Sequence, residues 1–161
     1  MKKIIYLAGG CFWGVDAYFS SIKGVLETET AYANGKTNKT YYENLKTTDH
    51  AETVKITYDD ELISLKEILE YFYYIVDPFS IDKQGNDRGR QYRTGIYAED
   101  EETLQTARKF LEDKQKNEKE KIQIQVEKLK NYVKAEEYHQ DYLKKNPLGY
   151  CHINLSDKPK I

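Results

Sequence analysis

The order of apolar patterns in the first 98 residues constrains the fold most strongly. Six segments follow one another, each strand-like or helix-like in the spacing of its apolar residues: Ile4–Ala8, Val15–Ile22, Val25–Ala33, Val54–Tyr58, Leu65–Val76 and Tyr92–Tyr97. Apolar residues in short runs or in alternation indicate strands, and those three or four positions apart indicate helices. The resulting β-α-β-β-α-β order predicts an α+β protein with a ferredoxin-like split-βαβ core, a two-layer sandwich of sheet and helices.

Patterns beyond residue 98 predict an extension of this core. Weaker periodicity indicates a helix, a strand and a short last helix, at Leu104–Leu111, Ile122–Glu127 and Ala135–Lys145. The tail from Asn146 has little pattern of its own, so we expect it to be poorly structured. We expect a single catalytic domain over residues 1–161, with its core at about 1–98 and its extension and tail at 99–161.

Charge and composition exclude several classes of partner. The 25 basic and 27 acidic residues give a net charge of −2, which argues against a globally basic nucleic-acid binder. The apolar runs are shorter than the ~20 residues of a membrane span, and the N-terminal run is too short for a signal peptide. Two cysteines, Cys11 and Cys151, form neither a disulfide scaffold nor a zinc site. We therefore expect a cytoplasmic, metal-free monomer without nucleic-acid or membrane partners.

The expected topology brings chemically active residues to one edge of the sheet. In a split-βαβ sheet the first strand lies antiparallel between the third and the fourth. The end of the first strand therefore lies beside the starts of the other two. Cys11 occupies the first of these places, His50 and Glu52 the second, and Asp87 and Tyr92 the third. A thiol, a carboxyl group and a phenol are expected to converge there.

Cys11 lies in the segment Gly9–Gly14, with sequence GGCFWG, between a strand and a helix. A helix N-terminus favours a thiolate, and two glycines allow a tight turn and close approach of a substrate. A buried cysteine that acts only as a small hydrophobe is the alternative. The flanking glycines and aromatic residues favour a reactive cysteine with an apolar wall.

Glu52 is either a solvated carboxylate at a strand end or an acid beside an aromatic pocket. In the second case its pKa rises, and it can donate a proton near neutral pH. For His50 we expect a loop-capping hydrogen bond rather than a role as a base. The polar segment Gln84–Arg93 suits a rigid, hydrogen-bonded loop and matches no nucleotide-binding fingerprint.

Cys151 is a second thiol in a segment that contains Gly149 and can move. A mobile thiol is what a reactive cysteine needs if its product is a sulfenic acid. On spacing alone, an unpaired tail cysteine without a role is equally compatible with the sequence.

The segment Gly10–Gly14 resembles the peptide methionine sulfoxide reductases of the A type. Further blocks of the chain match that family in the same order: Ala31–Gly35, His50–Glu52, Gln84–Asp87 with Gln91–Arg93, and Tyr138–Leu143 running on to Asn146–Cys151. Together they cover nearly the whole chain. The resemblance implies reduction of methionine S-sulfoxide, free or in proteins, to methionine, with thioredoxin or dithiothreitol as reductant and no other cofactor.

Roles at matching positions follow from the resemblance. It implies that Cys11 attacks the sulfoxide sulfur, that Glu52 protonates the oxygen, and that Cys151 resolves the sulfenic acid as a disulfide. Hydrogen-bond donors to the oxygen would be Tyr92 and, counted without gaps from Gly35, Tyr42. Its neighbour Tyr41 is the alternative, because the family pattern before this tyrosine is disrupted.

Substrate contacts are also implied by the resemblance. Phe12 and Trp13 would form the wall that holds the methyl group of the substrate. Asp87 would orient the substrate and order the site, and Tyr150 would contribute to binding.

A thiol peroxidase and an RNA-binding module are the two alternative functions for a chain with these residues. A thiol peroxidase also needs two cysteines, but the arginine and threonine expected around a peroxidatic thiol are missing near Cys11. An RNA-binding module of ferredoxin-like fold would carry its aromatic residues on central strands. The net charge and the aromatic residues at a helix start argue against that module.

Overall fold

A computed structural model describes residues 1–159 of the chain, so the last two positions of the expected domain, 160–161, lie outside the described residues. The six elements expected in the core are present: β1 (Lys2–Gly9), α1 (Phe12–Ser20), β2 (Val25–Ala33), β3 (Ala51–Asp59), α3 (Leu65–Ile75) and β6 (Thr94–Ala98). Short helices and a two-stranded hairpin join them: η1 (Tyr42–Asn44), α2 (Leu45–Thr48), β4 (Lys83–Gln84), β5 (Asp87–Arg88) and η2 (Arg90–Tyr92). The extension contains α4 (Glu101–Gln115), β7 (Gln125–Lys128), β8 (Val133–Lys134), η3 (Glu137–His139) and α5 (Tyr142–Lys145).

The strands of the core pair as the sequence predicts. Within residues 1–159 the main sheet has the order β7-β6-β1-β3-β2-β8. β1 lies antiparallel between β3 and β6, with Leu7 opposite Val54 and Gly9 opposite Thr94. The end of β1 therefore meets the starts of β3 and β6 at one edge, which is the edge that places Cys11, Glu52 and Tyr92 near one another.

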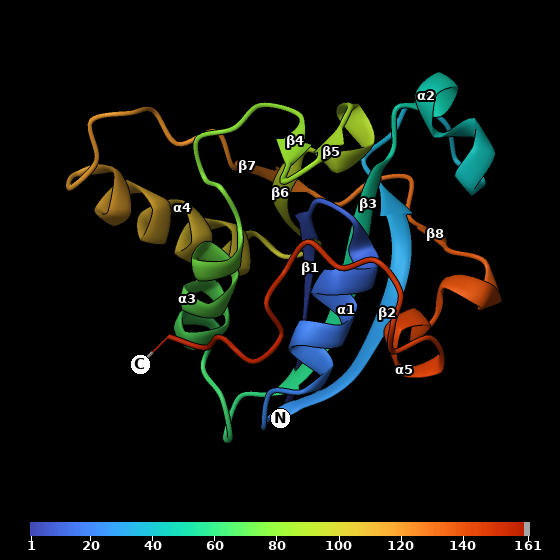
Figure 1. Ribbon diagram of the computed structural model, residues 1–161. Coiled ribbons are helices and arrows are strands. Elements are labelled where there is room, and N and C mark those ends of the chain that lie inside the picture. The colour runs from blue at the N-terminus through green and yellow to red at the C-terminus, as the bar shows by residue number, and fades with distance from the viewer. Residues whose placement is uncertain (160–161) are drawn as a thin grey trace.

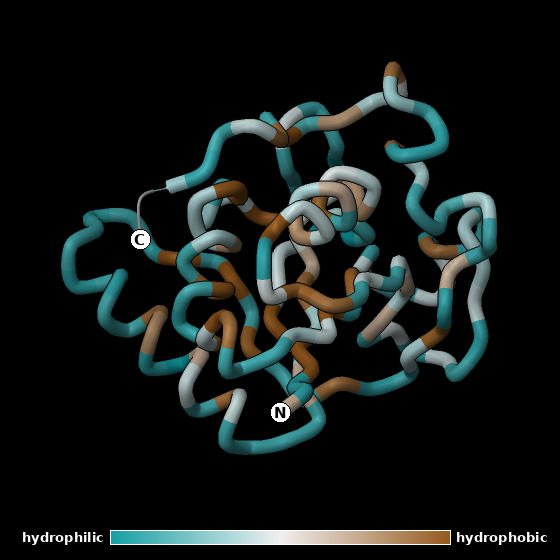
Figure 2. The backbone as a smooth tube through the Cα atoms, turned by 90° about the horizontal axis from the view of Figure 1, so that it is seen from below, coloured by the Kyte–Doolittle hydropathy of each residue, from teal (hydrophilic) through white to brown (hydrophobic). Residues whose placement is uncertain are grey.

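Helices α1 and α3 pack on one face of this sheet and bury its largest core (Figure 1). Side chains from both helices and from the central strands meet there, among them Val15, Phe19, Leu69, Phe72 and Ile56. The hydrophobic segments of the chain gather in this interior, whereas the outer loops are hydrophilic (Figure 2). The hydrophobic cluster on the opposite face is smaller, and Leu129 and Tyr132 from the segment before β8 pack against it.

Local signals explain where several elements begin. The Ser64 hydroxyl accepts a hydrogen bond from the backbone N–H of Glu67, and the Glu67 carboxylate accepts one from Ser64, so the predicted capping box starts α3. The Asp100 carboxylate caps α4 by accepting a hydrogen bond from the backbone N–H of Thr103. Within the described part of the chain, no helix combines the length and apolar character needed to cross a bilayer.

The expected helix at Ala135–Lys145 is wrong. That region contains only the turn η3 and the four-residue α5, separated by Asp141 in a left-handed conformation with φ of 51°. The side chain of Gln140 explains the interruption, because its amide donates to the carbonyl of Thr30 and accepts from the N–H of Thr30. It thereby satisfies the backbone of β2, which a continuous helix would not do.

Two other boundaries differ from the prediction. Tyr92 lies in η2 rather than in the strand, and the strand expected from Ile122 begins only at Gln125. The tail has no helix or strand over 146–159, yet it is packed against the core. Ile153 is 8% exposed, and the carbonyl of Asp157 accepts a hydrogen bond from Tyr18 on α1. Single side-chain contacts hold this segment, so no periodic pattern marks it.

Candidate active site

Cys11 is the N-cap residue of α1, directly after the end of β1. The residue is only 8% exposed. Burial, followed by the charge of Glu52, raises the pKa of the thiol, and the backbone N–H of Trp13 opposes this only in part. In the resting structure burial thus acts against the thiolate that a helix N-terminus favours.

Glu52 lies on β3 beside Cys11 and is 1% exposed. Its Oε1 accepts a 3.2 Å hydrogen bond from the N–H of Phe12, and its Oε2 accepts a 2.7 Å bond from the amide of Gln91. Burial raises the pKa of Glu52 to about 8, although both hydrogen bonds act in the opposite direction. The structure thus places a buried carboxyl group, able to hold a proton at neutral pH, next to the thiol.

Tyr42 and Tyr92 face this carboxyl group from η1 and η2. Burial and the charge of Glu52 raise the pKa of both phenols, so both hydroxyls remain donors. The two phenols also affect each other, which lowers the pKa of Tyr42 and raises that of Tyr92. Tyr41 is 55% exposed. Of the two candidates from the sequence, Tyr42 is therefore the one placed with Tyr92.

A carboxylate that the sequence analysis missed holds Tyr42 in place. Glu136 accepts a 3.0 Å hydrogen bond from the N–H of Tyr42 through Oε2 and a 2.7 Å bond from the hydroxyl of Tyr32 through Oε1. It joins the loop that carries Tyr42 to the buried strand β2. Glu136 precedes the block Tyr138–Leu143, but its position beside Tyr42 requires the fold.

Aromatic rings surround the first turn of α1. Phe12 is buried against Tyr32 and His139, with ring centroids 5.6 Å and 5.0 Å away. Trp13 stacks on Tyr142 at 3.7 Å and donates from its indole N–H to Nδ1 of His139 over 2.9 Å. His139 was not among the candidates from the sequence. Burial lowers the pKa of its imidazole, which keeps the ring neutral among these aromatic residues.

Cys151 approaches α1 from the C-terminal segment. Its sulfur lies 3.1 Å from the position that a Cβ on Gly14 would occupy, and neither cysteine is in a disulfide. The hydroxyl of Tyr150 donates a 3.1 Å hydrogen bond to Asp87. All four residues assigned from the sequence to the tail and the loop edge, Asp87, Tyr92, Tyr150 and Cys151, therefore lie around the β1–α1 turn.

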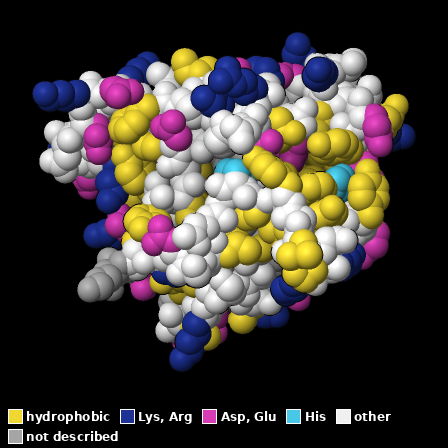
Figure 3. All heavy atoms as spheres, viewed as in Figure 1, with side chains coloured by type: hydrophobic (Ala, Val, Ile, Leu, Met, Phe, Trp, Pro, Cys, Tyr) yellow, Lys and Arg dark blue, Asp and Glu magenta, His cyan; other side chains and the backbone are white. Residues whose placement is uncertain are grey.

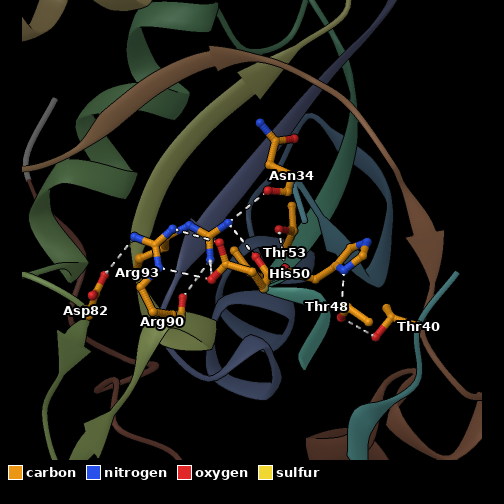
Figure 4. Close-up of polar contacts among 10 residues, drawn as sticks. Asn34, Thr40, Thr48, His50, Thr53, Asp82, Arg90 and Arg93 are labelled. Carbon is orange, nitrogen blue, oxygen red and sulfur yellow. Dashed lines mark hydrogen bonds and ion pairs between the residues drawn. The ribbon is translucent and has the colours of Figure 1, made fainter. Parts of the chain in front are cut away.

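A second set of polar residues supports the edge of the sheet (Figure 4). The guanidinium of Arg93 donates to the carbonyls of Asn34, Asp49 and Arg90. His50 bonds the Thr48 hydroxyl and the carbonyl of Asn131, which confirms the expected loop-capping role. These contacts fix the loops on either side of Glu52.

The polar segment Gln84–Arg93 is hydrogen-bonded at its first residue, as its composition predicts. The amide of Gln84 bonds Asp77, Ser80 and Thr94 at 2.8–3.2 Å. On the molecular surface, hydrophobic side chains gather over α1 and the C-terminal segment, with histidine visible among them (Figure 3). The arrangement combines a thiol, a buried carboxyl group with a raised pKa, two phenols and an apolar surround.

Comparison with known proteins agrees with this geometry. Residues 3–160 match the family model described as peptide methionine sulfoxide reductase. The reduced form of Mxr1 from Saccharomyces cerevisiae is 37% identical, with a TM-score of 0.87 over 93% of this chain and 88% of Mxr1. Methionine sulfoxide reductase A of Corynebacterium diphtheriae is 33% identical, with a TM-score of 0.86 over 93% of this chain and 77% of that protein.

Mxr1 has also been crystallised in complex with Trx2. That structure is 28% identical to this chain, with a TM-score of 0.64 over 88% of this chain and 84% of Mxr1. The family match covers nearly the whole sequence, and both the fold and the two cysteine-bearing segments lie within it. The chain belongs to the peptide methionine sulfoxide reductase family, in its A type, and is a peptide-methionine (S)-S-oxide reductase.

Proposed function

We propose that this single-domain enzyme reduces methionine S-sulfoxide, free or in oxidised proteins, by attack of the Cys11 sulfur on the sulfoxide sulfur. A sulfoxide oxygen leaves poorly unless it is protonated during the attack, so the nucleophile and an acid must act on the same S=O bond. The observation that carries the proposal is the hydrogen bond from Phe12, next to Cys11, to the buried carboxyl of Glu52.

In the proposed step Glu52 gives its proton to the sulfoxide oxygen, and the carboxylate that remains accepts the proton of the Cys11 thiol. The oxygen moves to Cys11 as a sulfenic acid, and methionine leaves. Burial opposes a lone charge on either group, since it raises the pKa of both. Proton exchange within the pair avoids such a charge. Tyr42 and Tyr92 would donate hydrogen bonds to the same oxygen and stabilise its developing charge.

The apolar surround would bind the substrate. Phe12 and Trp13 would hold the methyl group, with Trp13 oriented by its stack on Tyr142. Asp87 and Tyr150, which bond each other across the β1–α1 turn, would orient the rest of the substrate. The four central strands with α1 and α3 would be a ferredoxin-like unit that presents these groups at one sheet edge.

Cys151 would then condense with the sulfenic acid to form a Cys11–Cys151 disulfide, and thioredoxin would reduce it by thiol–disulfide exchange. The complex of Mxr1 with Trx2 supports thioredoxin as the reductant. The chain contains only these two cysteines, so this disulfide would be the species that thioredoxin attacks.

The two resolved epimers of dabsylated methionine sulfoxide, with dithiothreitol as reductant, test the proposal. We expect the S epimer to be reduced and the R epimer to remain, with no methionine from Cys11→Ser even in a single turnover. Methionine formation by Cys11→Ser would remove Cys11 from its role. Consumption of hydrogen peroxide in place of the sulfoxide would favour the thiol peroxidase.

A further inference from the structure

The side chain of His152 is buried, although the residues from Asn154 to Asp157 are exposed. Its side chain is 5% exposed, and its Nε2 lies 3.0 Å from the carbonyl oxygen of Gly9 at the end of β1. A carbonyl oxygen only accepts hydrogen bonds, so Nε2 carries the proton and donates. Burial lowers the pKa of the imidazole more than Gly9 and Asp87 raise it, which favours the neutral ring in this tautomer.

The β1–α1 turn has the space that this ring requires. Gly10 adopts a φ of 89°, and a Cβ at this position would lie 3.0 Å from Nε2 of His152 and 2.6 Å from the Cβ of Gln84. From the sequence, the two glycines are expected to allow a tight turn and the close approach of a substrate. The turn is present, but the close approach to Gly10 in this structure is made by side chains of the protein itself.

Cys151 is held between two anchored neighbours. On one side Tyr150 bonds Asp87, and on the other His152 bonds Gly9. The next residue, Ile153, packs into the main core. Gly14, which the sulfur of Cys151 faces, lies three positions after Cys11 and hence on the same side of α1. The thiol of Cys151 therefore lies about one helical turn from that of Cys11.

We propose that His152 is a positioning residue for disulfide formation: its hydrogen bond to Gly9 anchors the segment 150–153 at the β1–α1 turn and keeps Cys151 beside Cys11. The inference rests on the proposed resolving role of Cys151. In that step the sulfur of Cys151 attacks the sulfenic acid of Cys11. The S–O bond breaks, the S–S bond forms, and the thiol proton leaves with the oxygen as water. The sulfoxide is the oxidant.

Anchoring matters because a disulfide forms only when the two Cα atoms come within about 7 Å. A segment released from the turn spends more time away from Cys11, which lowers the effective concentration of Cys151. The first step, in which methionine is formed, needs only Cys11 and is independent of this anchor. Loss of the anchor should thus separate the two steps kinetically.

The test compares His152→Ala, which lacks the donor, with His152→Gln, whose side-chain N–H reaches about as far as Nε2. Reduced enzyme is mixed with one equivalent of methionine sulfoxide and no reductant. Methionine is measured by quenched flow, and the disulfide by alkylation and mass spectrometry. For His152→Ala we expect methionine formation within about twofold of wild type and disulfide formation about tenfold slower, with the sulfenic acid trapped by dimedone. His152→Gln should restore most of the rate.

Tyr74→Phe is the matched control. It removes the 2.8 Å hydrogen bond from Tyr74 to Asp157, which holds the tail further along, and should leave the disulfide rate unchanged. A wild-type disulfide rate in His152→Ala would overturn the inference. So would disulfide formation in His152→Gln and Tyr74→Phe that is slowed as much as in His152→Ala. Wild-type enzyme that yields methionine but no disulfide would refute the resolving role of Cys151 itself, before any His152 variant is compared.

Discussion

The backbone N–H of Phe12 donates a 3.2 Å hydrogen bond to the carboxyl group of Glu52, forty positions further along the chain. Phe12 immediately follows Cys11 at the start of α1, so this bond ties the buried acid to the residue next to the thiol. Gln91 holds the other carboxyl oxygen. With both oxygens held, the carboxyl group is oriented toward the first turn of α1. Substitution of Glu52 therefore tests the role of its proton.

Replacing Glu52 by Gln should slow methionine formation by roughly 10²–10⁴-fold at pH 7, because the amide fills the same space but supplies no acidic proton. A single-turnover quenched-flow measurement with excess enzyme checks this. Glu61→Gln, at an exposed glutamate in the turn after β3, is the control and should leave the rate unchanged. A rate within a few-fold of wild type in Glu52→Gln would show that the proton comes from another group.

Removal of one phenol should cost less than removal of the acid, because Tyr42 and Tyr92 would share one oxygen. We expect Tyr42→Phe and Tyr92→Phe each to lower the single-turnover rate by about tenfold. Tyr41→Phe should have no effect, since Tyr41 is 55% exposed. The same single-turnover assay compares the three variants. If Tyr41→Phe slowed the reaction as much as Tyr42→Phe, Tyr42 could not be singled out as the second donor.

Cys151→Ser should separate the chemical step from its regeneration. About one methionine per enzyme should still form in a single turnover, because attack on the sulfoxide needs only Cys11. Steady-state turnover with thioredoxin should collapse, since no disulfide forms, whereas dithiothreitol should rescue part of the rate by direct reduction of the sulfenic acid. Measured turnover with each reductant decides the point, and full thioredoxin-dependent turnover would make Cys151 dispensable.

The sequence predicts the central strand pairing because that pairing follows from alternating patterns and their order. The convergence of Cys11, Glu52 and Tyr92 then follows from strand direction alone. Contacts made by single side chains could not be predicted in this way. Glu136 contacts Tyr42 and His139 contacts Trp13, and more than ninety positions of the chain separate each pair. No periodic pattern in the sequence marks either contact.

Burial is the second reason why the structure differs from what the sequence predicts. A helix N-terminus is visible in the sequence and suggests a thiolate at Cys11. The depth of the residue appears only when the tail and both loops are in place, and it reverses the direction of the pKa shift. The same dependence on packing explains why the tail was expected to be poorly structured: His152 and Ile153 hold it through individual contacts.

The buried acid should also make stability depend on pH. Burial raises the pKa of Glu52 from an ordinary value near 4.5 to about 8, so the folded state holds a proton that the unfolded chain releases above pH 4.5. Below that pH both states are protonated and the residue imposes no penalty. As pH rises toward 8 the unfolded state gains relative stability, on the order of 4 kcal/mol at pH 8.

Glu52→Gln removes this titration. We therefore expect the difference in unfolding free energy between Glu52→Gln and wild type to grow in favour of the variant from pH 5 to pH 8, and to level off above pH 8, where the folded carboxyl ionises as well. Urea unfolding of both proteins across this range, followed by circular dichroism, measures the difference. Glu61→Gln corrects for the loss of one surface charge. A difference that is constant with pH would mean that Glu52 is ionised in the folded state and cannot act as the acid.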